Sequence, residues 1–251
     1  MTTFKAYFKK EIMESKRQYK YIILAVGIIA FAILNPFMLK ILPKIMEQQL
    51  KGDLSSLFIS TPKSAINEYI KSLFQIGTLF IIFTLGSSLN QEITEEKFLF
   101  PYSKGSNPAG IVLAKIIHYT IVVTVLTFIG FLTCAYYGGV LLKGEQVSLS
   151  GLLDSALLMS VFYFFNITLV TLFSSLVKKG VTAGLITLII TFVSAIFTNL
   201  DTVGKFMPYK LIQGANSFTL KNYSLTMGFI FICSILFIII TIIKMNKVEV
   251  I

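Results

Sequence analysis

Charged residues are scarce in this sequence. They make up 14% of its 251 residues, against about 25% in a typical soluble domain. Hydrophobic residues make up 55%, and the mean hydropathy is +0.80. This composition excludes a soluble globular protein and also a disordered one. The apolar residues fall in blocks too long for core strands, which indicates a helical membrane protein.

Histidine and cysteine are nearly absent as well. The single histidine, His118, cannot form a metal site alone, and the HExxH motif is missing. Cys134 and Cys233 each lie within an apolar block without a CxxC spacing. We therefore expect both cysteines to pack as small hydrophobic side chains.

Motifs for ATP binding and intramembrane proteolysis are also missing. The only Gly-Lys pair is Gly204-Lys205, and Asn199 stands where a P-loop GxxxxGK[ST] needs its first glycine. Glu95-Glu96 begins like the EExxxR motif of some intramembrane proteases, but Phe100 replaces the arginine. We therefore expect this chain to be no enzyme and to bind no metal or cofactor. Any ATP-driven work must draw on another subunit.

The hydrophobic blocks predict six membrane-spanning helices in one domain that covers residues 1–251. Their approximate ranges are 21–42, 69–89, 110–132, 152–176, 181–198 and 223–243. Asn35-Pro36 is expected to kink the far end of the first span. The expected fold class is an all-α integral membrane protein.

Residues 2–20 precede these spans and carry six basic side chains. Phe4, Phe8, Ile12 and Tyr19 recur among them at near-helical spacing. This pattern predicts an N-terminal amphipathic helix that lies in the membrane interface.

The net charge of +10 favours anionic lipid headgroups over nucleic acid as the partner, because the basic residues flank hydrophobic spans. Six spans place both termini on one side. That side carries 13 of the 22 Lys and Arg residues, with the densest cluster at the N-terminus. Both termini are therefore predicted to be cytoplasmic in a multi-pass protein of the cell membrane.

Two segments on the other side are longer than turns. Residues 43–68 carry amphipathic stretches that predict a short surface helix. Residues 199–222 contain apolar side chains around Pro208 and are either a re-entrant element or an ordinary loop.

Polar side chains within the spans are few. Asn166, Thr168 and Thr171 form the most polar line of the fourth span, and His118 lies early in the third. These groups either bridge neighbouring helices or line a substrate path. None of the twelve acidic residues is expected at mid-membrane, which disfavours a proton-coupled carrier.

The segment between the second and third spans combines charged and aromatic residues. Three glutamates and a lysine are followed within six residues by Phe98, Phe100 and Tyr102. Asn107-Pro108 then provides an N-cap and a first-turn proline for the next helix. Large apolar groups outside the bilayer need a burial partner. The rings are therefore expected either to insert among lipid headgroups or to dock in a groove of a soluble protein.

The whole chain resembles the permease subunit of ABC transporters of the ABC-2 family, bacterial exporter type. The resemblance lies in the N-terminal amphipathic helix, six spans, the acidic cluster, the Pro-Tyr-Ser turn and the entry Ile111–Lys115 into the third span. The chain departs from the family pattern where no Gly-Thr follows the acidic group and Ala114 replaces a common glycine.

The resemblance implies an ATP-driven exporter of a hydrophobic or amphipathic substrate, such as a peptide, an antimicrobial compound or a lipid-like molecule. Two cytosolic ATPase subunits would hold ATP and Mg, and a second permease copy or a paralogue would complete the transporter. The residues implied to couple this chain to the ATPase are Glu92, Glu95, Glu96, Lys97, Phe98, Leu99, Phe100, Pro101, Tyr102 and Ser103.

Three small residues, Gly180, Ala183 and Gly184, form a GxxxG-type face that predicts close helix approach and is a candidate dimer face. The competing interpretation of the whole chain is a non-transporting immunity or sensor protein that binds an amphipathic peptide. Such a protein would need neither the aromatic segment nor an ATPase.

Overall fold

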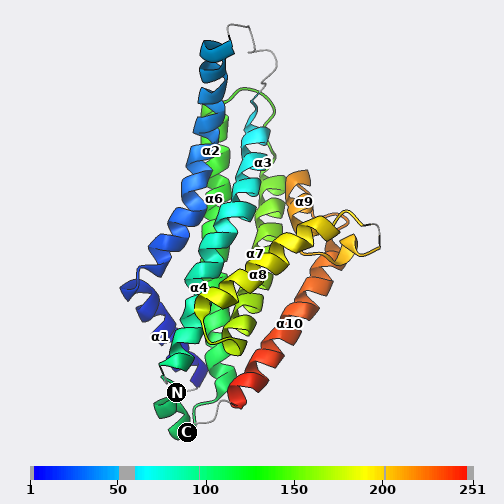
Figure 1. Ribbon diagram of the computed structural model, residues 1–251. Coiled ribbons are helices and arrows are strands. Elements are labelled where there is room, and N and C mark those ends of the chain that lie inside the picture. Colours follow the sequence, from blue (N-terminus) through cyan, green and yellow to red (C-terminus); the bar gives the residue numbers. More distant parts are fainter. Residues whose placement is uncertain (1–2, 51–59, 96, 201, 248–251) are drawn as a thin grey trace.

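A computed structural model describes residues 3–50, 60–95, 97–200 and 202–247, apart from the side chains of residues 44–50, 99 and 100. Throughout this part of the chain, all regular elements are helices (Figure 1). In chain order they are α1 (Thr3–Arg17), α2 (Lys20–Leu50), α3 (Pro62–Ser72), η1 (Leu73–Gly77), α4 (Thr78–Thr94), α5 (Leu99–Ser103), α6 (Pro108–Leu141), α7 (Leu149–Leu176), α8 (Gly180–Phe197), η2 (Gly204–Phe206), α9 (Lys210–Ser217) and α10 (Ser224–Asn246).

Within the described residues, six helical stretches are long and apolar enough to cross a membrane. They are Lys20–Pro43, Pro62–Thr94, Pro108–Leu141, Leu149–Leu176, Gly180–Phe197 and Ser224–Asn246. The prediction of an all-α membrane protein with six spans is therefore confirmed. The second stretch extends beyond its predicted range, because polar residues at both ends continue the helix past the apolar block. The third runs on to Leu141 through further, mostly apolar residues.

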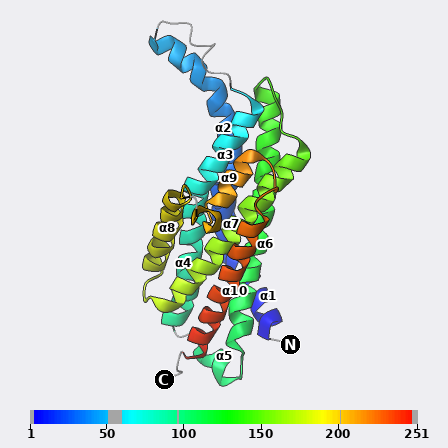
Figure 2. The same ribbon diagram turned by 90° about the vertical axis from the view of Figure 1, so that its right-hand side faces the viewer.

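The bundle has both chain termini at one end, where α1 and α5 also lie (Figures 1 and 2). α1 ends just before Tyr19, whose φ of 54° marks the bend between α1 and α2. The structure thus contains a helix before the first span, and this helix packs against α6. Its predicted placement in a membrane interface is part of the function proposed below.

The first span continues through both of its prolines. Pro36 and Pro43 lie inside α2, which runs on to Leu50. The far end of this helix bends away from the bundle in Figure 2, in line with the expected effect of an internal proline. The predicted surface helix over 43–68 falls partly on residues 51–59, outside the described residues.

The second span is interrupted by a π-helical turn, η1, that joins α3 to α4 without ending the helix. The Leu73 carbonyl accepts hydrogen bonds from Thr78 Oγ1 at 3.2 Å and from Tyr163 Oη of α7 at 3.0 Å. The same carbonyl accepts the backbone N–H of Thr78, the i→i+5 hydrogen bond of the π-turn. The two hydroxyls therefore add to a backbone hydrogen bond, and the one from Tyr163 joins the turn to α7.

The centre of the bundle is α7, which packs against α4, α6, α8, α9 and α10. Its polar side chains form hydrogen bonds within the bundle. Asn166 Nδ2 donates to the Phe162 carbonyl at 2.9 Å, and Asn166 Oδ1 accepts from Thr191 Oγ1 of α8 at 2.6 Å. Asn166 thus bridges two helices, as one of the two sequence-based interpretations expected.

The outer connection between α8 and α10 packs against the bundle. It contains the short helices η2 and α9, and α9 packs back against α7 and α3. Ser155 Oγ of α7 donates to the Ala215 carbonyl at 2.7 Å. The segment is therefore built into the bundle at the end opposite the termini.

Candidate functional site

Residues 97–107, which include α5 and lead into α6, form a compact hook at the end of the bundle that holds both termini (Figure 2). Phe98 is only 4% exposed and stacks on Tyr102, with ring centroids 5.6 Å apart. Tyr102 Oη donates to the Met245 carbonyl near the end of α10 at 3.5 Å. Burial raises the pKa of Tyr102 to about 12. Part of the expected aromatic burial is thus provided by the chain itself.

The hook ends at the N-cap of α6. Asn107 Oδ1 accepts from the Ala109 amide at 2.9 Å, and Pro108 occupies the first turn of α6, as the sequence predicted. The Asn107 amide also donates to Thr3 Oγ1 of α1 at 3.3 Å. The start of α6 and the start of α1 are therefore joined at this end.

The outer side of the hook is charged. Lys97 Nζ and Glu95 Oε2 form an ion pair of 2.5 Å, and both side chains are about half exposed. The hydrogen bond to Glu95 raises the pKa of Lys97. Among the other predicted coupling residues, Ser103 is exposed and Pro101 is partly buried, while Glu96 and the side chains of Leu99 and Phe100 lie outside the described residues.

Glu92, the first of the predicted coupling residues, points inward and not toward a partner. It is 1% exposed and belongs to a buried charge cluster that links α1, α4 and α6. At its centre, Lys115 Nζ of α6 lies 2.8 Å from Glu11 Oε1 and 3.2 Å from Glu92 Oε1. It also donates to Ser88 Oγ of α4 at 3.0 Å. All three charged side chains are at most 3% exposed.

A second layer of charge surrounds this centre. Lys10 Nζ lies 2.5 Å from Glu92 Oε1 and 3.5 Å from Glu14 Oε2. Lys20 Nζ, at the start of α2, lies 3.5 Å from Glu14 Oε1 and donates to Ser88 Oγ at 3.3 Å. Together the residues of this buried charge cluster are Lys10, Glu11, Glu14, Lys20, Glu92 and Lys115.

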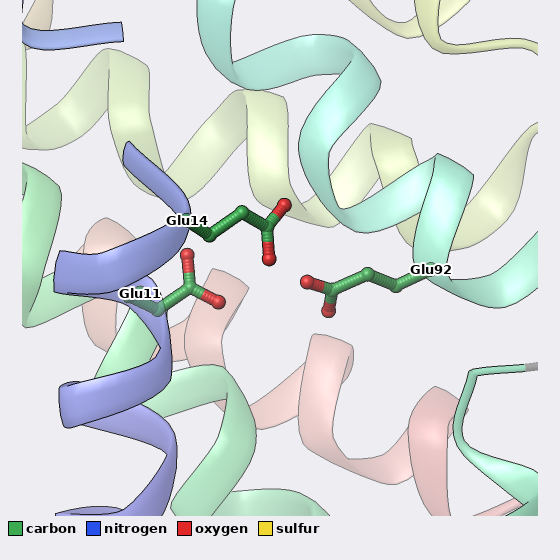
Figure 3. Close-up of side chains that lie close together, drawn as sticks. All are labelled: Glu11, Glu14 and Glu92. Carbon is green, nitrogen blue, oxygen red and sulfur yellow. The ribbon is translucent and has the colours of Figure 1, made fainter. Parts of the chain in front are cut away.

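Figure 3 shows the three glutamates of the cluster converging, two from α1 and one from α4. Their carboxylate oxygens lie within 4.8 Å of one another, a spacing that also suits a bound cation. Three lysines already balance the three negative charges, so an added divalent cation would be repelled or would have to displace an ammonium group. Because of this charge balance, we interpret the cluster as a network of ion pairs. Within it, Glu11 Oε2 and Glu92 Oε2 are buried without a hydrogen-bond partner.

Two side chains of α1 near this cluster have shifted pKa values. Burial opposes the charged form of Glu14, but Lys10 and Lys20 outweigh it and lower its pKa. Burial and the nearby Glu92 raise the pKa of Tyr7 to about 12. Both groups thus keep their ordinary charge states at neutral pH.

His118 lies one turn beyond Lys115 and extends the polar contact between α1 and α6. Its Nε2 is 3.2 Å from Ser15 Oγ and 3.3 Å from Tyr21 Oη. The ring also packs edge-on against Phe8, with centroids 5.7 Å apart. His118 therefore acts in helix packing, one of the two roles considered for it.

The cluster fixes α1 to the bundle through its polar face. On α1 the fully buried residues are Glu11 and Ser15, whereas Phe4 and Tyr19 of the predicted apolar edge stay exposed. Sequence analysis missed this site because Glu11 and Lys115 are 104 residues apart. The available signal was a lysine inside the apolar run of residues 108–141, a position that demands a counter-charge.

The other predicted site residues lie in packed interior. Thr168 and Thr171 are buried and donate to carbonyls of their own helix. The small-residue face of α8 packs on α4 of the same chain, where Gly180 and Gly184 meet Gly86. The close helix approach predicted for this face is therefore made within one chain, and the face is not free for a second copy in this arrangement.

Comparison with family models gives no match for this chain, and comparison with curated proteins gives none either.

Proposed function

We propose that this chain is the permease subunit of an ABC-2-type exporter. A separate cytosolic ATPase, which binds ATP and Mg, would drive it, and two such ATPases would serve a pair of permeases. The second permease is another copy of this chain or a paralogue. Its substrate is hydrophobic or amphipathic, because the spans offer few polar groups and the described charged cluster is internally paired.

The observation that carries this proposal is the position of α5. This short helix lies beyond the ends of α4 and α6 at the end of the bundle that holds both termini (Figure 2). Glu92 lies near the end of α4, shortly before α5 in the chain. Its ion pairs with Lys10 and Lys115 connect α4 to α1 and α6. A force applied to the hook is therefore transmitted to three helices at once through short, buried ionic contacts.

α1 supports the same proposal. It packs its polar face on the bundle and leaves Phe4, Met13 and Tyr19 exposed. An outward apolar edge suits a helix in the membrane interface, with basic side chains directed toward anionic lipid headgroups. In the proposed orientation this end is cytoplasmic, where the ATPase can reach α5.

The test is co-purification of the full chain with an ATPase encoded beside it, followed by measurement of ATP turnover. The variant Glu95→Ala/Phe100→Ala changes two of the proposed coupling residues and no residue of the charge cluster. We expect ATPase association to weaken at least tenfold, because interface residues that act as anchors contribute about 2 kcal/mol or more. The matched control Lys143→Ala/Glu145→Ala, at the opposite end, should bind as wild type.

The outcomes separate the alternatives. Normal association by the hook variant would exclude α5 as the coupling element. If no ATPase associates with the wild-type chain, the exporter proposal fails, and direct binding of an amphipathic peptide becomes the property to measure.

A further inference from the structure

An apolar groove runs between α8 and α10 in the half of the bundle away from the termini. Both helices pack against α7, and Phe165 of α7 lies between them. The groove has a volume of about 290 Å³. Its lining residues are Phe165, Ile190, Val193, Ser194, Phe197, Phe206, Met207, Pro208, Phe229, Ile230, Cys233 and Phe237.

A polar cavity adjoins the groove at the end of the span. It has a volume of about 510 Å³. Its described lining residues are Thr198, Asn199, Leu200, Gly204, Lys205, Lys210, Gln213, Asn222, Leu225 and Thr226. The two cavities are lined by neighbouring residues of the chain, since Phe197 and Thr198 are consecutive, as are Lys205 and Phe206.

The charge of the polar cavity is positive. Lys210 Nζ donates to the neutral Gln213 Oε1 at 3.0 Å, and Lys205 forms no ion pair with any residue that the structure describes. From residue 199 to residue 226 the sequence holds three lysines and one acid, Asp201, which lies outside the described residues. An anion that entered this cavity would therefore meet two ammonium groups that form no ion pair with the residues that the structure describes.

Along α10 the polar cavity comes first and the apolar groove second, as the polar headgroup and the acyl chain follow one another in a lipid. Leu225 and Thr226, in the first turn of the helix, line the polar cavity, and Phe229 to Phe237 line the groove. Eight residues of helix span about 12 Å, close to the roughly 15 Å that one leaflet contributes to a 30 Å hydrocarbon core. A methylene group is about as large as a water molecule, roughly 30 Å³, so the groove holds on the order of ten methylenes.

We propose that this composite site binds one anionic phospholipid of the surrounding bilayer. The phosphate headgroup lies between Lys205 and Lys210, and one acyl chain fills the groove between α8 and α10. The groove is open on its outer side, because Val193 and Phe229 remain about 40% exposed. A lipid can therefore enter laterally from the membrane. The proposal does not depend on the proposed function, since it applies equally to a transporter and to a non-transporting membrane protein.

The test uses the full chain purified in detergent, freed of lipid, and titrated with phosphatidylglycerol or phosphatidylcholine under native mass spectrometry. Wild type should bind one phosphatidylglycerol more tightly than phosphatidylcholine. Lys205→Gln/Lys210→Gln should weaken phosphatidylglycerol binding about 30-fold, because each lysine near a lipid headgroup contributes about fivefold. Lys205→Arg/Lys210→Arg should retain it, and the matched control Lys143→Gln/Lys221→Gln should be unchanged.

A second variant tests the groove. Val193→Trp places an indole where the acyl chain would lie and should weaken binding of both lipids. Val181→Trp, at an exposed position on the same helix outside the groove, should bind as wild type.

Three results would overturn the proposal. If inorganic phosphate competes as well as the lipid does and Val193→Trp has no effect, the site holds only an anion. If Val193→Trp converts a dimer to a monomer, a second copy of this chain covers the groove. Equal binding of the two lipids by wild type would remove the role assigned to the lysines.

Discussion

Lys115 occupies a position that a membrane helix rarely gives to a charge. It lies two turns into α6, almost fully buried, and is held by two carboxylates and one hydroxyl. A buried ion pair gains little over a hydrophobic contact, but removal of one partner leaves an uncompensated charge. Lys115 is therefore needed because Glu11 and Glu92 are there.

Replacement of Lys115 by methionine should destabilise the protein by about 3–5 kcal/mol. Two buried glutamates would then lose their central counter-charge, and α1 would be released from α6. Thermal unfolding of the detergent-solubilised protein measures the loss. Lys63→Met is the control, because its pair with Glu145 is exposed at 3.5 Å and contributes about 1 kcal/mol or less.

A double variant checks the cause. Glu11→Gln/Lys115→Gln removes both members of one pair and should be less destabilising than Lys115→Gln alone. Additive losses would show that the two side chains act independently and that the cluster does not hold α1.

The spans of this protein can be predicted from the sequence, whereas the ion pairs of the buried charge cluster cannot. The spans were predictable because apolar length and helix caps such as Asn107 are local signals. The sequence predicts that Glu92 faces a partner protein, because it belongs to the acidic cluster on which the family resemblance rests. Its inward orientation depends on Lys10 and Lys115, which only the packing of three helices brings close. Long-range ion pairs leave no periodic trace in one sequence.

At the scale of elements, the contact of α8 with α4 depends on glycine. A Cβ at Gly180 would meet the Cα of Ser87 and the carbonyl of Gly86, both of which are backbone atoms. Backbone cannot move aside as a side chain can, so any larger residue must push the two helices apart. The GxxxG pattern predicted this approach correctly in kind, although it could not show which helix is approached.

Gly180→Ala should therefore lower the thermal stability of the solubilised protein, at a cost of about 1–3 kcal/mol. Gly228→Ala is the matched control, because a Cβ there meets nothing within 4 Å and alanine favours the helix by up to about 1 kcal/mol. Equal stability of the two variants would show that α4 and α8 are not in close contact.

At the scale of the whole molecule, six spans bring the two termini to one end (Figure 1). The hook, which contains α5, and the buried charge cluster lie at that end. The composite site near α9 lies at the other end. The two ends thus present different chemistry, which suits a protein with distinct contacts on each side of a membrane.

Reporter fusions at residue 1 and at residue 251 should both report a cytoplasmic location. The expectation follows from the basic residues at this end, which orient membrane helices toward the cytoplasm. A reporter inserted after Gly144, in the connection between α6 and α7, should report the opposite side. A shared external location of both termini would place α5 out of reach of a cytosolic ATPase.

The docking of α1 also sets an order of assembly. α1 is synthesised first, but its charged partners Glu92 and Lys115 follow Lys10 and Glu11 by 82 and 104 residues. Until the third span is inserted, Glu11 lacks Lys115 and is best solvated in water at the membrane surface. The first helix to leave the ribosome therefore finds its place only after the third span, and its docking completes the N-terminal half of the bundle.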